Sequence, residues 1–252
     1  MTTPGIAAQM FTLRDYLKTP QEIAATMKRV REIGYTAVQL SALGPIEPKE
    51  LAVILEREDL AAVITHTPYS RLVDDLPGVI ADHRTLRCPN VAIGSMPAEF
   101  RNQQGFVEFA KVASEIARRL AEAELTFSYH NHSFEFERFA GKTGLQIFYE
   151  NSDPLVLAEL DTYWVQHGGG DPAEWIDWLK GRMVVIHLKD MTISKGEQMM
   201  AEVGEGNLNW PRIIDACRRT NIPWYAVEQD ICQRDPFESL TISLRNLKAM
   251  GV

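Results

Sequence analysis

One stretch of the chain, LVLAELDTYWVQHGGGDPAEWIDWLKGRMVVIHLK at residues 155–189, contains a complete strand–helix–strand unit. It begins and ends with near-continuous apolar runs, Leu155–Asp161 and Val184–Lys189, which are typical of parallel strands covered on both faces. Between them, Asp171-Pro172 combines an N-cap residue with a proline suited to the first turn of a helix over Ala173–Lys180. The stretch therefore predicts two parallel strands joined by a helix.

The same alternation continues in both directions along the chain. The predicted strands are Ile6–Phe11, Ala37–Leu40, Ala61–Thr67, Val91–Ser95, Thr126–His132, Leu155–Asp161, Val184–Lys189 and Trp224–Gln229. Helical patterns stand between several of them, at Pro20–Ile33, Phe106–Ala123, Gly144–Glu150, Ala173–Lys180, Trp210–Arg219 and Phe237–Met250. Strict alternation predicts a parallel sheet, and eight rounds predict that the sheet closes into a (β/α)8 TIM barrel.

The length of the chain agrees with this fold. A (β/α)8 barrel needs about 250 residues, and the chain has 252. No low-complexity segment or Gly/Ser linker interrupts the series, so we predict a single domain over residues 1–252. The alternative, an open doubly wound sheet, would need a glycine-rich phosphate loop after the first strand, and residues 7–13 contain no glycine.

The composition limits the partners of the protein. The formal net charge of -8 argues against nucleic acid or an anionic membrane as the main partner. The three cysteines form no C-x-x-C pair, which favours a reducing cytoplasm over a disulfide framework. Met1–Ile6 lacks the basic and apolar parts of a signal peptide, and no run of 18 uncharged apolar residues occurs. We therefore expect a cytoplasmic protein without a membrane span.

Polar and charged side chains gather at the ends of the predicted strands, where barrels of this kind build their active sites. From the first strand to the last they are Gln9, Gln39, His66, His130, Asn131, His132, Glu159, Asp161, His187, Lys189, Asp190, Glu228, Gln229 and Asp230. Histidines and carboxylates close the last four strands in succession. Neighbouring parallel strands lie about 4.8 Å apart, so inward-facing groups on them can converge on one ion.

Each of these residues also has a purely structural interpretation. A lone histidine at a strand end is more often a hydrogen-bonded core residue than a ligand, and Gln9 and Gln39 can simply fill polar layers. Asp161 can cap the following turn, and Glu228 can pair with Arg234 or Arg245. Four adjacent strands with such ends favour a shared site instead, because burying several carboxylates without a cation is costly.

The donor types indicate which ion such a site would take. A mixed set of histidines and carboxylates suits a divalent ion such as Mn²⁺, Zn²⁺, Co²⁺ or Mg²⁺. No thiolate is positioned to help, and there are too few histidines to single out zinc. Of the four ions we favour Mn²⁺.

Several segments match the pattern of a known family. They are Tyr129–Phe136 (YHNHSFEF), Glu159–Asp161 with Trp164 and Gly169–Pro172, His187–Asp190 (HLKD), Val227–Asp230 (VEQD) and Gly204–Gly206. With these segments the chain resembles the xylose isomerase-like barrel superfamily and, within it, the sugar phosphate isomerase/epimerase group. The motifs span the C-terminal half, and the strand–helix order fits the whole chain. The pattern is specific for the superfamily but not for a substrate.

The resemblance implies one divalent metal ion, which the family typically binds through Glu, Asp, His and Glu on strands five to eight. Asp161, His187 and Glu228 match three of these ligands. Where sugar epimerases carry the strand-five glutamate, this chain has His130. We take His130 as the fourth ligand, with His132 and Glu135 as alternatives.

The resemblance also implies proton transfer through an enediolate. In the family's epimerases two glutamates exchange protons with the substrate, whereas here Glu228 would act with His130 or His132. An imidazole titrates near neutrality, so such a pair can still work as acid and base. The replacement makes symmetric two-base epimerisation less secure.

Four further residues are candidates for binding a sugar-like substrate. His66 and Lys189 are placed to contact hydroxyl groups, and Trp164 is placed to cover an apolar sugar face. Glu205 is placed either to contact substrate or to hold its loop. The alternative for Lys189 is a surface lysine that caps a helix.

These observations predict a metal-dependent isomerase or epimerase of a sugar, sugar phosphate or keto-sugar. A lyase of the inosose dehydratase type, acting on keto-sugars or oxidised glycosides, is the main alternative. A catalytically silent sugar-binding barrel is a further one. A DNA-repair endonuclease on the same barrel would need several more histidines for a multi-metal site and a basic face, whereas this chain has six histidines and is acidic. Barrels of this sort often self-associate, so a homo-oligomer is compatible with the sequence.

Overall fold

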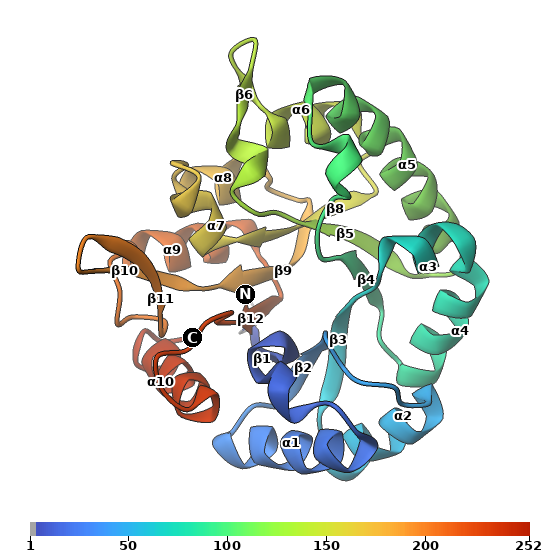
Figure 1. The fold of residues 1–252 in the computed structure, drawn as a ribbon, viewed down its shortest axis with the longest axis vertical. Coiled ribbons are helices and arrows are strands. Elements are labelled where there is room, and N and C mark those ends of the chain that lie inside the picture. Colours follow the sequence, from blue (N-terminus) through green and yellow to red (C-terminus); the bar gives the residue numbers. More distant parts are fainter. Residues whose placement is uncertain (1–3) are drawn as a thin grey trace.

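The computed structural model describes residues 4–252, and eight parallel strands form a closed barrel in it (Figure 1). Around the barrel the strand order is β1-β12-β9-β8-β5-β4-β3-β2. The bounds are β1 Gly5–Gln9, β2 Ala37–Leu40, β3 Ala61–His66, β4 Asn90–Ile93, β5 Thr126–His130, β8 Val156–Asp161, β9 Met183–Leu188 and β12 Trp224–Val227. The predicted (β/α)8 barrel is thus confirmed. Residues 1–3, part of the predicted domain and of the segment Met1–Ile6, lie outside the described residues.

Helices form the outer layer of the barrel (Figure 1). They are α1 Pro20–Ile33, α2 Pro48–Arg57, α3 Tyr69–Asp74, α4 Leu76–Leu86, α5 Gln103–Glu122, α6 Gly144–Asn151, α7 Thr162–His167, α8 Pro172–Trp178, α9 Trp210–Thr220 and α10 Pro236–Ala249, with short 3-10 helices η1 Met10–Tyr16, η2 Ala98–Phe100 and η3 Phe134–Phe136. None of the helices in the described part of the chain is long and apolar enough to cross a membrane.

Local signals mark the helix ends, and Asp171 acts as the predicted N-cap. It accepts hydrogen bonds from the backbone amides of Ala173 and Glu174 in α8, and Asn209 accepts one from the amide of Arg212 in α9. Gly34 ends α1 in the left-handed conformation with φ 114°, where a glycine carries no steric penalty. These local signals fix where each helix begins and ends, and so where each following strand can start.

Of the four strands that carry the site, β5, β9 and β12 end earlier than predicted, whereas β8 ends at Asp161 as predicted. β5 ends at His130, which pairs with Glu159 of β8 as the last pair of that ladder. His132 therefore lies in the loop beyond the sheet. β9 stops at Leu188, which leaves Lys189 just outside the ladder. Two hairpins also interrupt the barrel pattern, β6–β7 (Arg138–Phe139 and Lys142–Thr143) and β10–β11 (Asp190–Ser194 and Glu197–Ala201).

The interior of the barrel changes character along its axis. Small and branched apolar side chains form a buried cluster: Ala7, Ala37, Val63, Ile64, Ala92, Val185 and Ala226. Toward the C-terminal strand ends the inward-facing residues are polar or charged instead, and they are equally buried, as Glu159 and His187 show. The buried charged groups therefore lie next to an apolar layer of the barrel interior. Electrostatic interactions among them are strong because little solvent screens them.

Candidate active site

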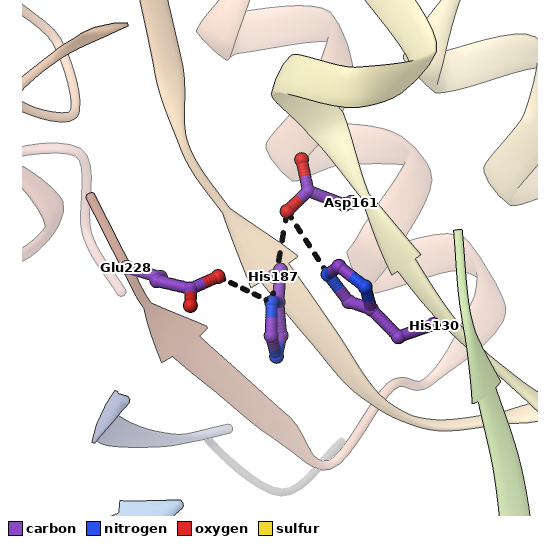
Figure 2. A group of neighbouring side chains, drawn as sticks. All are labelled: His130, Asp161, His187 and Glu228. Carbon is purple, nitrogen blue, oxygen red and sulfur yellow. Dashed lines mark hydrogen bonds and ion pairs between the residues drawn. The ribbon is translucent and has the colours of Figure 1, made fainter. Parts of the chain in front are cut away.

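Four side chains from four neighbouring strands converge at the C-terminal mouth of the barrel. Figure 2 shows His130, Asp161, His187 and Glu228 pointing toward one another. Each offers one ligand atom, these atoms lie within 4.8 Å of one another, and all four residues are buried. The distance from His187 Nδ1 is 2.9 Å to Glu228 Oε2 and 3.6 Å to Asp161 Oδ2. The structure thus brings the four predicted metal ligands together.

Asp161 caps a helix, as one sequence interpretation expected, and also faces the cluster of donors. Its Oδ1 accepts a hydrogen bond from Trp164 N at 2.9 Å and so caps α7. Its backbone amide donates to Asn131 Oδ1. The cap fixes the orientation of the carboxylate, and Oδ2 lies 3.3 Å from His130 Nε2. Oδ1 thus caps the helix α7, and Oδ2 faces the cluster of donors.

His187 stands between two sets of partners. Its Nε2 lies 2.8 Å from Gln39 Oε1 and 3.0 Å from Glu159 Oε1. This leaves Nδ1 to face Asp161 and Glu228. Burial alone would lower the pKa of His187, but the carboxylates of Glu159 and Glu228 hold it well above its ordinary value. An imidazole held in this way presents one nitrogen in a fixed direction.

Glu228 is oriented by a residue from the neighbouring strand β1, which pairs with β12. Its Oε1 accepts a hydrogen bond from Gln9 Nε2 at 2.6 Å. Burial would raise the pKa of Glu228, but Lys189 and His187 hold it below its usual range, so the carboxylate stays ionised. Arg234 and Arg245 pair with Glu202 and Glu205 instead, so the sequence-based alternative of a simple Glu228–arginine pair is wrong.

Lys189 belongs to the same cluster. Its side chain is 2% exposed, which contradicts the alternative of a surface lysine. Its Nζ lies 2.5 Å from Glu228 Oε2, 3.1 Å from Asp161 Oδ2 and 3.0 Å from Asp230 Oδ1. Burial would lower the pKa of Lys189, but the three carboxylates raise it above its ordinary value, so the amine is an ammonium.

Glu159 is a functional candidate that the sequence analysis placed on the right face of its strand but gave no role. It is fully buried, and its Oε2 lies 2.7 Å from His66 Nε2. The imidazole of His66 is thus linked to the charged cluster through Glu159. On its other side the ring packs against Gly94, where a larger residue would not fit, because an added Cβ would lie 2.9 Å from His66 Nδ1. The available signal was the period of two that puts Glu159 and Asp161 on one face.

A cavity of about 470 Å³ opens onto the cluster. It is lined by Phe11, Arg14, Ser41, His66, Gly94, His130, His132, Lys189, Glu228, Asp230 and Ile231. His132 adds an imidazole that packs against Trp164, with ring centroids 5.3 Å apart. Burial and the neighbouring His130 lower the pKa of His132 to about 3, so this ring is neutral and only a weak base at neutral pH, unlike the imidazole titrating near neutrality that the sequence led us to expect.

Two sequence candidates lie elsewhere. Glu135 accepts hydrogen bonds from the Tyr129 hydroxyl and the His132 amide, so its two oxygens are engaged behind the strand-five loop. The Glu205 side chain bonds to Asn246 of α10 at 2.8 Å. The structure therefore places Glu205 at the loop contact that the sequence left as an alternative, and it does not bring its carboxylate into the cavity lining.

The donor set suits a divalent cation. Two imidazole nitrogens and two carboxylate oxygens are the mixture that borderline and hard divalent ions accept. His187 Nδ1 and Glu228 Oε2 lie 2.9 Å apart but make no well-aligned hydrogen bond in the described part of the chain, and Lys189 Nζ lies 2.5 Å from Glu228 Oε2. These buried atoms are thus held mainly by charge, and a cation between them would serve the same purpose.

Comparison with known proteins supports the same architecture. A family model described as "Xylose isomerase-like TIM barrel" matches residues 27–248. No curated protein is significantly similar to the chain in sequence. Among solved structures, a sugar phosphate isomerase/epimerase from Parabacteroides distasonis ATCC 8503 has a TM-score of 0.82 and 24% identity over 99% of this chain and 95% of its own.

Two more distant solved structures share the fold. An L-ribulose 3-epimerase has a TM-score of 0.73 and 16% identity over 99% of this chain and 94% of its own. A probable 3-DHS dehydratase from Bacillus anthracis has a TM-score of 0.72 and 14% identity over 97% of this chain and 98% of its own. At these identities the likeness establishes the barrel, and any activity must be argued from this chain's own residues.

Proposed function

Given that the chain belongs to the xylose isomerase-like TIM barrel family, we propose that it is a divalent-metal-dependent isomerase or epimerase of a sugar, sugar phosphate or keto-sugar. The observation that carries the proposal is the convergence of four buried donors within 4.8 Å at the mouth of the barrel. A cavity large enough for a small molecule opens at the same place, and it contains both imidazole and carboxylate groups. The solved relatives named above include proteins described as isomerases and epimerases.

We assign the metal ligands to His130, Asp161, His187 and Glu228, and we favour Mn²⁺ as the ion. When bound, such an ion supplies Lewis-acid stabilisation for negative charge that develops on a substrate oxygen. The chain itself fixes the geometry: the α7 cap turns Asp161 inward, and Gln39 with Glu159 holds the ring of His187. A preorganised set of this kind need not rearrange during the reaction.

Proton transfer falls to Glu228 and a strand-five histidine. His130 is tied to Gly94 O and Asp161, which suits a ligand, whereas His132 Nδ1 has no hydrogen-bond partner among the described residues. We therefore assign Glu228 and His132 as the acid–base pair. Removal of a proton beside a carbonyl and its return to the adjacent carbon gives isomerisation. Its return to the opposite face of the same carbon gives epimerisation.

Substrate contacts follow from the cavity lining. We propose that His66 and Lys189, which line the cavity, bind substrate hydroxyl groups. Trp164 is not among the lining residues but packs against His132, which is, and we propose that it covers an apolar face of the sugar there. His66 is held by Glu159, which fixes the direction in which its remaining nitrogen points. A small polar substrate would therefore be held between a fixed imidazole and an ammonium.

A lyase is the second candidate, and a pair of one carboxylate and one imidazole is compatible with it. Both groups are unprotonated at neutral pH, so the group that removes the proton would pass it on to the departing hydroxyl, which leaves as water. The barrel has a described dehydratase among its solved relatives, so the fold accommodates that reaction.

The test is incubation of Mn²⁺-loaded protein with ketoses, keto-sugars and their phosphates in D₂O, followed by NMR and mass spectrometry. Deuterium incorporation beside the carbonyl without loss of water supports the isomerase or epimerase. An unsaturated product lacking water supports the lyase. The Glu228→Gln variant should lose both signals, while Glu115→Gln, the same change at an exposed position on α5, should keep them. Absence of exchange and elimination across the panel would contradict the proposal.

A further inference from the structure

We propose that the ammonium of Lys189 is the resident cation of the carboxylate cluster, and that a divalent metal ion must displace it toward Asp230 in order to bind. The inference rests on the proposed metal site and adds a competitor within the chain. It assigns Lys189 a role in controlling metal affinity, in addition to its proposed contact with substrate.

The first step is the position of the ammonium. Lys189 Nζ lies 3.1 Å from Asp161 Oδ2 and 2.5 Å from Glu228 Oε2. These are the same two oxygens that face His187 Nδ1, at 3.6 Å and 2.9 Å. An ion coordinated by both oxygens would need the space in which Nζ now stands.

The second step is electrostatic. Lys189 and both carboxylates are almost completely buried, so their charges are poorly screened by water. Without a metal ion, the ammonium of Lys189 and the imidazole of His187 beside it compensate the charge of these buried carboxylates. With a metal ion between the same oxygens, the ammonium would face a second cation at close range. The two cations therefore exclude each other sterically and electrostatically.

The third step is a place for the ammonium to go. Asp230 Oδ1 already lies 3.0 Å from Nζ, and its side chain is 21% exposed at the cavity. The four-carbon stem of lysine is flexible, so Nζ can leave Asp161 and Glu228 while it stays paired with Asp230. The shift moves the ammonium to the wall of the cavity, where a substrate hydroxyl can meet it.

The test is the Mn²⁺ affinity of Lys189→Met, measured at fixed pH by isothermal titration calorimetry against wild type. We expect the dissociation constant to fall at least tenfold. We also expect the Lys189→Met protein in chelator to melt at a lower temperature than wild type, and to gain more from added Mn²⁺. Lys180→Met, the same change at an exposed position, should leave all of these values unchanged.

A double-mutant cycle separates displacement from simple charge repulsion. Asp230→Asn removes the new partner of the ammonium, so it should weaken Mn²⁺ binding in the wild-type background. It should have little effect when Lys189 is already methionine, because there is then no ammonium to relocate. Equal effects of Asp230→Asn in the two backgrounds would mean that Asp230 acts on the ion directly, and would overturn the displacement.

The remaining outcomes also decide the matter. An unchanged or weaker affinity in Lys189→Met, in a protein whose wild type binds Mn²⁺, overturns the inference and leaves the proposed function intact. Failure of both proteins to bind any divalent ion overturns the proposed metal site itself, and the inference with it. If Lys189→Met folds only when Mn²⁺ is present, the ion has replaced the missing ammonium, which supports the inference. If it does not fold at all, the effect of Asp230→Asn on wild type decides.

Discussion

The two halves of the barrel mouth differ in charge. The strands β5, β8, β9 and β12 contribute carboxylates, imidazoles and an ammonium, whereas β1, β2 and β3 contribute two amides and one histidine. Each residue of the less charged half meets one partner in the charged half, from the adjacent strand for Gln9 and across the barrel interior for Gln39 and His66. Gln9 bonds to Glu228, Gln39 lies against His187, and His66 lies against Glu159.

This difference between the two parts of the barrel mouth explains how the side chains of the site keep their orientation. In the proposed function the charged half would supply the groups that bind the ion and react, and the less charged half holds their orientation through neutral contacts. Buried charges need hydrogen-bond partners that add no further charge, and amide side chains meet that need. The residues joined in this way are far apart in the chain, as for Gln9 and Glu228, so closure of the barrel assembles the site.

The largest effect is expected in the charged half. Asp161→Asn keeps the α7 cap but removes a charged donor, so Mn²⁺ should be lost and kcat/KM should fall by about 10³-fold or more. Metal content and steady-state kinetics check this. Asp59→Asn, the same change at an exposed position, should have no effect. Full activity of Asp161→Asn after metal removal would refute the assignment.

A smaller effect is expected in the less charged half. Gln39→Leu removes the neutral partner of His187 Nε2, so Mn²⁺ affinity should fall by about tenfold to a hundredfold. Turnover at saturating Mn²⁺ should largely recover, because no reacting group is lost. Glu159→Gln tests the second partner of the same nitrogen. A kcat that stays low at saturating metal would mean that Gln39 acts on the reaction directly.

The smallest effect concerns stability behind the strand-five loop. Burial raises the pKa of Glu135 to about 7, above the ordinary value of an unfolded glutamate. The folded state therefore keeps a proton that the unfolded state has released. The stability from Glu135 is complete below about pH 4.5 and is lost as pH rises to about 7, at up to about 1.4 kcal/mol per pH unit.

Urea unfolding of wild type and Glu135→Gln between pH 4.5 and pH 7 measures this contribution. The difference in free energy of unfolding between the two proteins should change in that window, since the variant cannot titrate. Glu115→Gln serves as the exposed control. Parallel pH profiles of wild type and Glu135→Gln would show that this carboxyl titrates alike in the folded and unfolded states.

The barrel was predictable from the sequence because its signals are local. Apolar runs mark the strands, and Asp171, Asn209 and Asp235 cap helices as expected. Convergence at the mouth was predictable too, because parallel strands must end at the same face. The ends of the strands were less predictable. The last residue pairs of the ladders are His130 with Glu159 and Leu188 with Val227, so His132 and Lys189 lie beyond the sheet.

Side-chain pairing across the barrel was beyond the sequence. Nothing in the pattern near Lys189 shows that its ammonium turns inward among three carboxylates, and a surface position was an equal alternative. Nothing near Glu159 shows that it meets His66 from another strand. Such contacts depend on closure of the barrel and on side-chain orientation, which a linear pattern does not encode. The same limit left open whether Glu205 holds its loop.

The central claim is that the last four barrel strands aim their donors at one cation. Anomalous diffraction from wild-type crystals soaked in Mn²⁺ tests it most directly. The account predicts one strong peak within coordination distance of Asp161 and Glu228 oxygens and of His130 and His187 nitrogens. Ordered side chains at these positions with no peak among them, or a peak only at another place on the protein, would contradict it.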